Sequence, residues 1–513
     1  MADGLGCKVL LVSLYSSDAI GLRYISANLK KNGCDVDLVF FKEKILESDT
    51  LTLPTDEEYG LFFRLVRDLR PDVVGISLRS AFFRTASVLT KKIQAEFQMP
   101  VVWGGTHPNI APEECLKIAD LICLGEGEFV MMELAQRISA GQDYSALPGL
   151  WVRKGEGIIR NPIRESIRDL DHLPYPDYGH QRKYLIEQNR IMSGDPILGR
   201  FNLDFLASRG CPYHCAFCCN SIFLEQSRGS GPIVRRRSVD NIIDEIEALK
   251  KKFVNLKRID FIDEVFVWDR AWSSEFASKY ARRIGLPFQC NQHPNMVNRE
   301  ILKMLKGAGL ERVTVGIQSG SERICRDVYD RPISNEAMIK TGQLLYELRI
   351  TPTYDLIVDN PFEDDDDRMK TLELLLRLPR PFLLRMFPLT YFPNTPLTRR
   401  ALDRGFITED RVESRAERTH SKWFVTMDYP WSRLQRFWIS LYSLTSKSFI
   451  PKRFIRWLTG RAFLRKNPLL LSNLATLSNN IKLAMIAFKW FGEGKSFKTI
   501  LRQRKRGQGH WQI

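Results

Sequence analysis

The 513-residue sequence predicts an α/β protein with two parallel sheets, followed by a mainly helical C-terminal region. Short apolar runs alternate with helical patterns as far as about residue 400. Strands of this kind, without inside–outside alternation, are typical of sheets that are covered on both faces. Beyond residue 400 the strand pattern is lost, and cations and aromatic residues become frequent. Length and composition fit a folded protein of two to four domains.

The first sheet is predicted from five apolar runs, at 8–14, 35–41, 72–78, 100–107 and 119–125. Helices are predicted at 20–31, between the third run and about residue 97, and at 131–139. This pattern predicts a flavodoxin-like domain, in which ligands bind beyond the carboxyl ends of the strands. Small and polar residues occupy those ends: Ser77, Gly104, Gly105, Thr106, His107, Gly125, Glu126 and Gly127. No G-x-G-x-x-G follows the first strand, so a dinucleotide-binding domain is not predicted.

The second sheet is predicted from six runs, at 202–207, 258–263, 287–290, 312–318, 353–358 and 382–387. Six strand–helix units make a partial (β/α)6 barrel, whose active site belongs at the carboxyl ends of its strands. The predicted domains are therefore 1–140, a linker with a small hairpin at 141–200, the barrel at 201–400, and a basic helical region at 401–513.

Three cysteines follow the first strand of the barrel with the spacing C-x₃-C-x₂-C: Cys211, Cys215 and Cys218. Thiolates in so short a loop cannot form a packed core, but they can converge on a soft metal centre. Structural zinc takes four ligands, and iron–sulfur cubanes normally take four thiolates. Three therefore indicate a [4Fe–4S] cluster with one open iron. A zinc site completed by His214 or Cys219 is the alternative, but no second ligand pair has zinc-finger spacing.

The charge of the chain is concentrated at its end. The net charge is +16, and residues 446–513 contain fifteen Lys/Arg and one acid, Glu493. Free thiolates for a cluster require a reducing compartment. The N-terminus has no signal-peptide pattern, and no run of 18 apolar residues occurs. We therefore expect a cytoplasmic protein.

The cysteine motif resembles that of the radical S-adenosylmethionine (SAM) enzymes. Together with the N-terminal GGTHP segment at 104–108 and LGEGE at 124–128, it resembles the B12-dependent class of that family. The resemblance implies three cofactors: the [4Fe–4S] cluster, SAM and cobalamin. It also implies that cobalamin lies against the residues at the ends of the first sheet. Asp18–Gly21 lacks the histidine of the cobalt-ligating D-x-H-x-x-G motif, so cobalamin is expected without a protein histidine on the cobalt.

The resemblance also implies which barrel residues hold SAM. The acid at the end of the second strand is expected to bind the SAM ammonium group, and Glu264 is favoured over Asp263. The segment 316–321 resembles the family's G-I-E-S-G segment with Gln in place of Glu. The implied SAM contacts are Phe217, Glu264, Gly316, Gln318, Ser319 and Arg331. Late-strand residues Tyr354, Asp355, Arg385 and Tyr391 either face the substrate or lie buried in the barrel wall.

The implied activity is methyl transfer to an unactivated carbon of a small molecule, with a flavodoxin or ferredoxin as reductant. The cationic, aromatic-rich tail favours a lipid-like substrate. Radical cyclisation or rearrangement without methyl transfer is an alternative. A tRNA methylthiotransferase would carry three further cluster cysteines at strand ends, which the N-terminal segment lacks as a set. A non-catalytic cobalamin or iron–sulfur sensor remains a fourth interpretation.

The tail interleaves cations with aromatic and aliphatic residues, in segments such as 449–458 and 480–491. This pattern is typical of helices that lie at a membrane interface. Peripheral binding to an anionic membrane is therefore predicted. A solvated helical subdomain covering the barrel is the alternative, and a nucleic-acid partner is less favoured.

Overall fold

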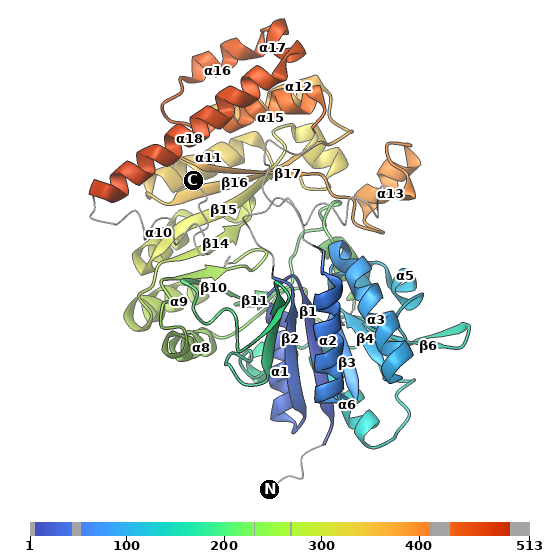
Figure 1. Cartoon of the computed structure of the whole chain (residues 1–513). Coiled ribbons are helices and arrows are strands. Elements are labelled where there is room, and N and C mark those ends of the chain that lie inside the picture. The colour runs from blue at the N-terminus through green and yellow to red at the C-terminus, as the bar shows by residue number, and fades with distance from the viewer. Residues whose placement is uncertain are drawn as a thin grey trace.

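The computed structural model describes residues 6–43, 53–229, 231–266, 269–410, 412 and 431–492. It contains two large sheets that follow each other along the chain. The N-terminal sheet lies at one end of the molecule, the second sheet lies in the middle, and the C-terminal helices lie at the other end (Figure 1).

The N-terminal sheet begins with five parallel strands, as predicted: β1 (Lys8–Leu14), β2 (Asp35–Phe41), β3 (Val73–Ser77), β4 (Val101–Gly104) and β5 (Leu121–Cys123). Its helices are α1 (Ile20–Lys31), α2 (Asp56–Leu69), α3 (Phe83–Phe97), α4 (Thr106–Ile110), α5 (Pro112–Leu116) and α6 (Gly127–Ser139). Two separate apolar cores include Phe62 of α2 with Ile93 of α3, and Leu29 of α1 with Leu134 of α6. Helices therefore cover both faces, which explains the uninterrupted apolar runs of the strands.

Residues 141–200, predicted as a linker with one hairpin, carry two hairpins that extend this sheet at both edges. The first is β6 (Leu150–Lys154) with β7 (Gly157–Arg160), antiparallel to β5. The second, which the sequence analysis missed, is β8 (Lys183–Glu187) with β9 (Arg190–Ser193) beside β2. The strand order is β7-β6-β5-β4-β3-β1-β2-β8-β9.

The second sheet contains the six predicted strands, all parallel and in chain order. They are β10 (Asn202–Phe205), β13 (Arg258–Phe261), β14 (Phe288–Gln292), β15 (Leu310–Gln318), β16 (Thr351–Val358) and β17 (Leu383–Pro388). Helices of this unit are α7 (Asn220–Gln226), α8 (Val239–Lys252), α9 (Arg270–Arg283), α10 (Arg299–Ala308), α11 (Asn335–Glu347), α12 (Asp365–Arg377) and α13 (Pro396–Asp403). A small antiparallel pair joins β11 (Ser208–Arg209) to β12 (Arg235–Arg236). The sheet is a curled parallel half-barrel, as expected for six such units.

The described C-terminal helices are α15 (Arg433–Thr445), α16 (Lys452–Thr459), α17 (Ala462–Lys466) and α18 (Pro468–Gly492). The first, α15, is largely buried and shares the apolar core of the barrel through Phe437 and Trp438. The Trp438 indole donates to Asp365 on α12 at 3.2 Å. This helix therefore covers the barrel. Among the described helices, none is both long and apolar enough to cross a membrane.

Candidate functional site

The cysteine loop begins directly after β10 and β11 and ends at α7, as predicted. Cys215 is buried, whereas Cys211 and Cys218 are partly exposed. The loop is turned on itself by backbone hydrogen bonds from Cys218 to Cys215 at 3.0 Å and from Ser221 to Cys218 at 3.1 Å. The three thiols thus lie at the carboxyl end of the first barrel strand, where barrel active sites are built.

These cysteines are expected to lose their thiol protons when an iron–sulfur cluster binds. Burial raises the pKa of Cys211 to about 11 and that of Cys218 to about 12, so both are thiols at neutral pH until a metal displaces the proton. Within the described ranges, no three His, Cys, Asp or Glu side chains converge on one metal ion. In an iron–sulfur cluster each thiolate binds a different iron, so the three thiolates do not have to meet at one point.

Gly210 sets the path of the chain into the loop. Its φ is +94°, in the left-handed region, and a Cβ would overlap the carbonyl oxygen of Ile233. Both the dihedral angle and the close approach require glycine here.

Gly210→Ala is therefore expected to prevent the loop from closing and to abolish iron binding during reconstitution. The left-handed conformation alone costs about 1–2 kcal/mol for a residue with a Cβ. Gly229→Ala is the matched control, because Gly229 also has a positive φ of +85° but open space around it. Iron content per chain measures the difference; equal iron loading of the two variants would contradict the role of the close approach.

One of the predicted SAM residues, Arg331, lies against the cysteine loop and links it to another, Gly316. The Arg331 guanidinium donates to the Cys215 sulfur at 3.4 Å and to the carbonyl of Gly316 at 3.3 Å. Arg331 is 9% exposed, and its Nε has no hydrogen-bond partner among the described residues. The arginine thus joins the carboxyl end of β15 to the loop and keeps a donor for a further group.

The two acids after β13 have separate roles. Asp263 is fully buried and accepts hydrogen bonds from the Ala207 amide and from the Ser208 hydroxyl, at 3.1 and 2.5 Å. It therefore fixes the start of the cysteine loop. Glu264 is exposed, but lies close enough to the loop that its charge raises the pKa of Cys211 and Cys218. Partial loss of water around its carboxylate raises the pKa of Glu264 itself. This separation supports Glu264 as the acid available to a bound amine.

The other predicted SAM residues, Ser319, Gln318 and Phe217, differ in the contacts that they make within the protein. The Ser319 hydroxyl donates to the partly buried Glu363 carboxylate at 2.9 Å, so its side chain is already engaged. Gln318 has a φ of +65° at the end of β15. The Phe217 ring packs edge-on against Tyr329, with 5.1 Å between ring centroids. As SAM contacts, all three remain predictions.

His293 was missed, although its position after β14 was a usable signal. Its ring stacks on Tyr213 of the cysteine loop, with 3.7 Å between centroids. The side chain is buried, and its Nε2 has no hydrogen-bond partner among the described residues. Burial and the nearby Arg331 charge lower the pKa of His293 to about 3, so the imidazole is neutral.

Four of the residues predicted to contact cobalamin share one edge of the N-terminal sheet. Ser77 ends β3, Gly104 ends β4, and Gly105 and Thr106 follow. Gly105 has a φ of +97° and approaches the backbone of Leu78. The strands are parallel, so the four residues lie together at the edge where ligands of such sheets bind. Gly125 follows the next strand, and its amide donates to Asn109 at 2.8 Å.

Three other residues of this group serve the protein itself. His107 is 3% exposed, hydrogen-bonds Ser80 at 2.9 Å and packs edge-on against Phe83, and its contact with cobalamin remains a prediction. Gly127 allows close packing of α6 on α1, because a Cβ there would meet Ile25 at 2.9 Å.

The third residue, Glu126, forms ion pairs with Arg209 and Arg235 of the second unit, both at 2.7 Å. Glu128 accepts from the same Arg209 at 2.6 Å and is buried. Burial opposes ionisation of Glu126, but the charges of Arg209 and Arg235 lower its pKa overall. Because Arg209 precedes Cys211 by two residues, these ion pairs, here called the Arg209 clasp, tie the cysteine loop to the N-terminal sheet.

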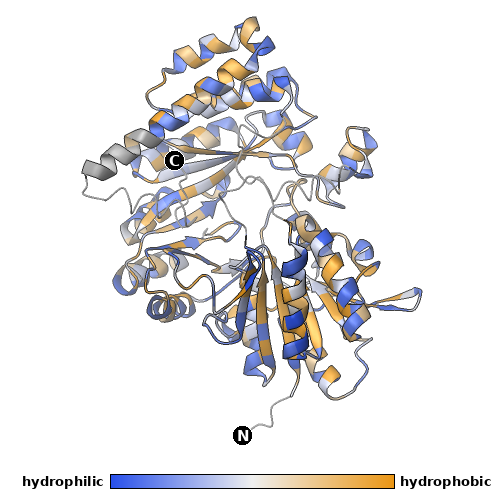
Figure 2. Ribbon diagram, in the orientation of Figure 1, coloured by the Kyte–Doolittle hydropathy of each residue, from blue (hydrophilic) through white to orange (hydrophobic). Residues whose placement is uncertain are grey.

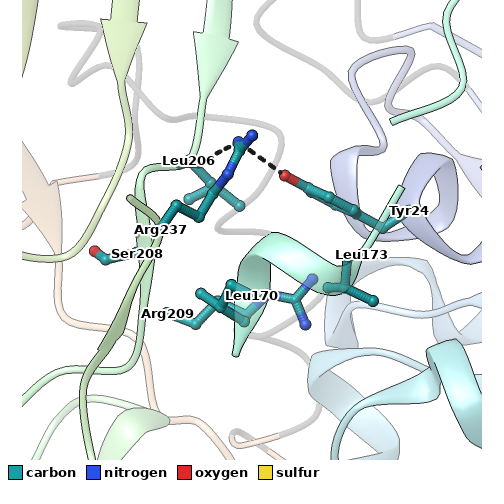
Figure 3. Close-up of a pocket in the computed structure, with 7 residues that line it drawn as sticks. All are labelled: Tyr24, Leu170, Leu173, Leu206, Ser208, Arg209 and Arg237. Carbon is teal, nitrogen blue, oxygen red and sulfur yellow. Dashed lines mark hydrogen bonds between the residues drawn. The ribbon is translucent and has the colours of Figure 1, made fainter. Parts of the chain in front are cut away.

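A small pocket lies beside the clasp, on the seam between the two units (Figure 3). Arg237 crosses it and donates to the Tyr24 hydroxyl at 3.2 Å and to the Leu206 carbonyl at 3.3 Å. Its free volume of about 10 Å³ has room for about one water molecule, so it cannot hold a cofactor. The seam is tightly packed here.

The remaining contacts between the two units surround the same edge of the N-terminal sheet. Arg200, just before β10, pairs with Asp18 at 2.7 Å and with Glu43 at 2.6 Å. On the other side, Asn394 donates to the Ile110 carbonyl at 2.6 Å. The carboxyl edge of the N-terminal sheet therefore faces the half-barrel.

The four side chains predicted on the late barrel strands, either facing the substrate or buried in the wall, divide into two pairs. Tyr354 and Tyr391 are buried in the wall. Asp355 and Arg385 are cross-strand partners that form a two-pronged ion pair at 2.6 Å, each about one-fifth exposed. This pair lies at the level of Gly316 on the neighbouring strand. The Asp355–Arg385 pair therefore presents an accessible polar group next to Gly316.

Comparisons with known proteins match both units. The sequence model of the B12 binding domain matches residues 6–135, and that of the Radical SAM superfamily matches residues 205–375. Cytidylyl-2-hydroxyethylphosphonate methyltransferase of Streptomyces wedmorensis is 24% identical over 62% of this chain and 64% of its own. The anaerobic magnesium-protoporphyrin IX monomethyl ester cyclase of Cereibacter sphaeroides is 26% identical over 65% of this chain and 53% of its own. The chain thus spans less than two-thirds of the length of either relative.

The arrangement of the units also occurs in a solved structure. The radical SAM methyltransferase TsrM of Kitasatospora setae, solved with cobalamin and a [4Fe–4S] cluster, superimposes with a TM-score of 0.63 at 16% identity, over 91% of this chain and all of that one. At this identity the match concerns the fold. With both domain models matched in this order and the three cysteines at the end of the first barrel strand, the chain belongs to the B12-binding radical SAM family.

Proposed function

We propose that this protein is a cobalamin-dependent radical SAM methyltransferase that acts on carbon of a small molecule. One observation carries the proposal: the cysteine loop is held against the carboxyl edge of the B12-binding domain by the Arg209 clasp. A radical generated at the loop would therefore arise next to a group bound at that edge. The methyltransferase among the relatives and the fold of a solved methyltransferase support methyl transfer.

In this proposal the residues described above bind and orient the cofactors. Cys211, Cys215 and Cys218 hold the [4Fe–4S] cluster, and Glu264 accepts hydrogen bonds from the SAM ammonium group. Arg331 donates to Cys215 and offers its free Nε to a further group. The residues at the ends of β3 and β4 hold cobalamin. When bound, the cofactors supply the radical and the methyl group, while the protein supplies position.

Isotope transfer tests this function. The reconstituted protein is incubated with reductant and SAM that carries a labelled methyl group, and products are analysed by mass spectrometry. The expected result is 5′-deoxyadenosine together with a product that carries the label. 5′-Deoxyadenosine with an unlabelled, cyclised or rearranged product would instead assign the reaction to the cyclase type. Absence of SAM cleavage would overturn the enzyme assignment.

We further propose a small flavodoxin or ferredoxin as electron donor and a cytoplasmic location, because all ten cysteines are free. The part of the substrate that enters the half-barrel is polar, because the Asp355–Arg385 pair is accessible there. A lipid-like substrate would therefore enter with its head group. Exposed apolar side chains on the C-terminal helices support a location at the inner face of a membrane.

A further inference from the structure

The outer surface of the last three described helices is unusually apolar. Nine of the nineteen large apolar side chains that are exposed in the described part of the chain lie between residues 449 and 485. They are Phe449, Phe454, Trp457, Phe463, Leu469, Leu470, Leu477, Ile481 and Met485. We call these nine side chains the outer apolar face. In Figure 2, hydrophobic and hydrophilic residues alternate along α16, α17 and the coloured part of α18.

The fold does not need the outer apolar face, because other residues of the same helices make the internal contacts. On α18, Leu471 and Ala475 are buried, and this helix packs along α15. On α16, Ile455 and Leu458 are buried in the shared core, while Phe454 and Trp457 point outward and stack on each other. Trp457 is 52% exposed. Helices α16 and α18 therefore each have an inner apolar stripe and a second, outer one.

Charge distinguishes this surface from an ordinary solvated one. No acidic residue occurs between residues 446 and 492. Arg456 and Arg465 form ion pairs with Glu373 and Asp365 of α12, so they hold the helices on the barrel.

Three exposed cations remain, Arg453, Arg461 and Lys466, and none forms an ion pair within the described ranges. The Arg461 guanidinium lies 4.0 Å from the centre of the Trp457 ring. A surface built only for solubility would mix charges of both signs. Cations beside exposed Trp, Phe and Leu instead match the boundary between lipid head groups and acyl chains.

We propose that the outer apolar face docks on an anionic lipid bilayer, with Trp457, Phe463 and Leu477 in the acyl boundary and Arg453, Arg461 and Lys466 at the phosphates. The described helices lie on the bilayer and do not cross it. This inference does not depend on methyl transfer. Each cation contributes about fivefold in affinity at an anionic surface, so three unpaired ones contribute about a hundredfold.

Vesicle flotation of the full-length reconstituted protein tests the proposal. Vesicles of phosphatidylcholine alone are compared with an equimolar mixture of phosphatidylcholine and phosphatidylglycerol. We expect flotation with the mixture, at least tenfold less with phosphatidylcholine alone, and release by salt. The triple variant Trp457→Ser, Phe463→Ser, Leu477→Ser is expected to lose at least tenfold in binding while SAM cleavage is unchanged.

The control variant removes three exposed apolar side chains elsewhere: Val88→Ser, Val254→Ser and Tyr346→Ser. It is expected to float like the unmodified protein. Equal loss in both triple variants would overturn the proposal, as would absence of flotation. Light scattering tests whether a second copy of the chain covers the outer apolar face instead. If the protein is a dimer that the Trp457→Ser, Phe463→Ser, Leu477→Ser variant dissociates, and it does not float with vesicles, the surface is a dimer interface. Salt-sensitive binding to duplex DNA without flotation would assign it to nucleic acid.

Discussion

Replacing Cys211, Cys215 and Cys218 together with Ala is expected to remove the cluster and all SAM cleavage. The three thiols occupy one turned loop at the end of β10, and no other side chain in that loop can bind iron as a thiolate except Cys219. Reconstituted iron should fall from about four atoms per chain to none, with loss of the visible absorption band. Activity should fall to the level without enzyme.

Cys219→Ala is the matched control for this variant. Cys219 adjoins Cys218 and is partly exposed, but its side chain packs against the apolar cluster of Ile110 and Ile222. The control is therefore expected to keep its iron and its SAM cleavage. Loss of iron from the Cys219 variant, or retention of iron by the triple variant, would contradict the three-thiolate assignment and favour a different ligand set.

The fold was predictable from local patterns. Strands β1 and β2 and helix α1 begin and end at the predicted residues, because strands buried on both faces leave uninterrupted apolar runs. The hairpin β8–β9 was missed because its second strand is largely exposed and carries no such run. Helix α2 was also missed, although Thr55 and Glu58 form the capping box that marks its start.

The site was predictable only where its residues are close in sequence. The three cysteines and the strand ends follow from spacing, since each lies within one short segment. Glu126, in contrast, was assigned to cobalamin because it follows β5, and its partner Arg209 is 83 residues further along the chain. Nothing in the spacing of the sequence indicates such a pair. A carboxylate at the end of a strand can bind either a ligand or a cation of another domain, and the local sequence is the same in both cases.

Replacing Arg209 with Ala is expected to destabilise the contact between the two sheet domains. It is also expected to uncouple SAM cleavage from methyl transfer. Arg209 and Glu128 are largely buried, and removal of one partner from a buried ion pair costs about 3–5 kcal/mol because the other charge remains. The melting temperature should fall. Methylated product per molecule of 5′-deoxyadenosine should fall as well, because the cysteine loop would no longer be fixed against the B12-binding edge.

A control and a rescue separate positioning from general damage. Arg299→Ala removes an ion pair to Glu347 in which both side chains are more than half exposed, so it should cost less than about 1 kcal/mol. Adding Glu126→Gln and Glu128→Gln to Arg209→Ala removes the uncompensated charges and should restore part of the stability. It should not restore coupling, because the clasp is still absent. If stability and coupling return together, the clasp stabilises the junction without positioning the cysteine loop.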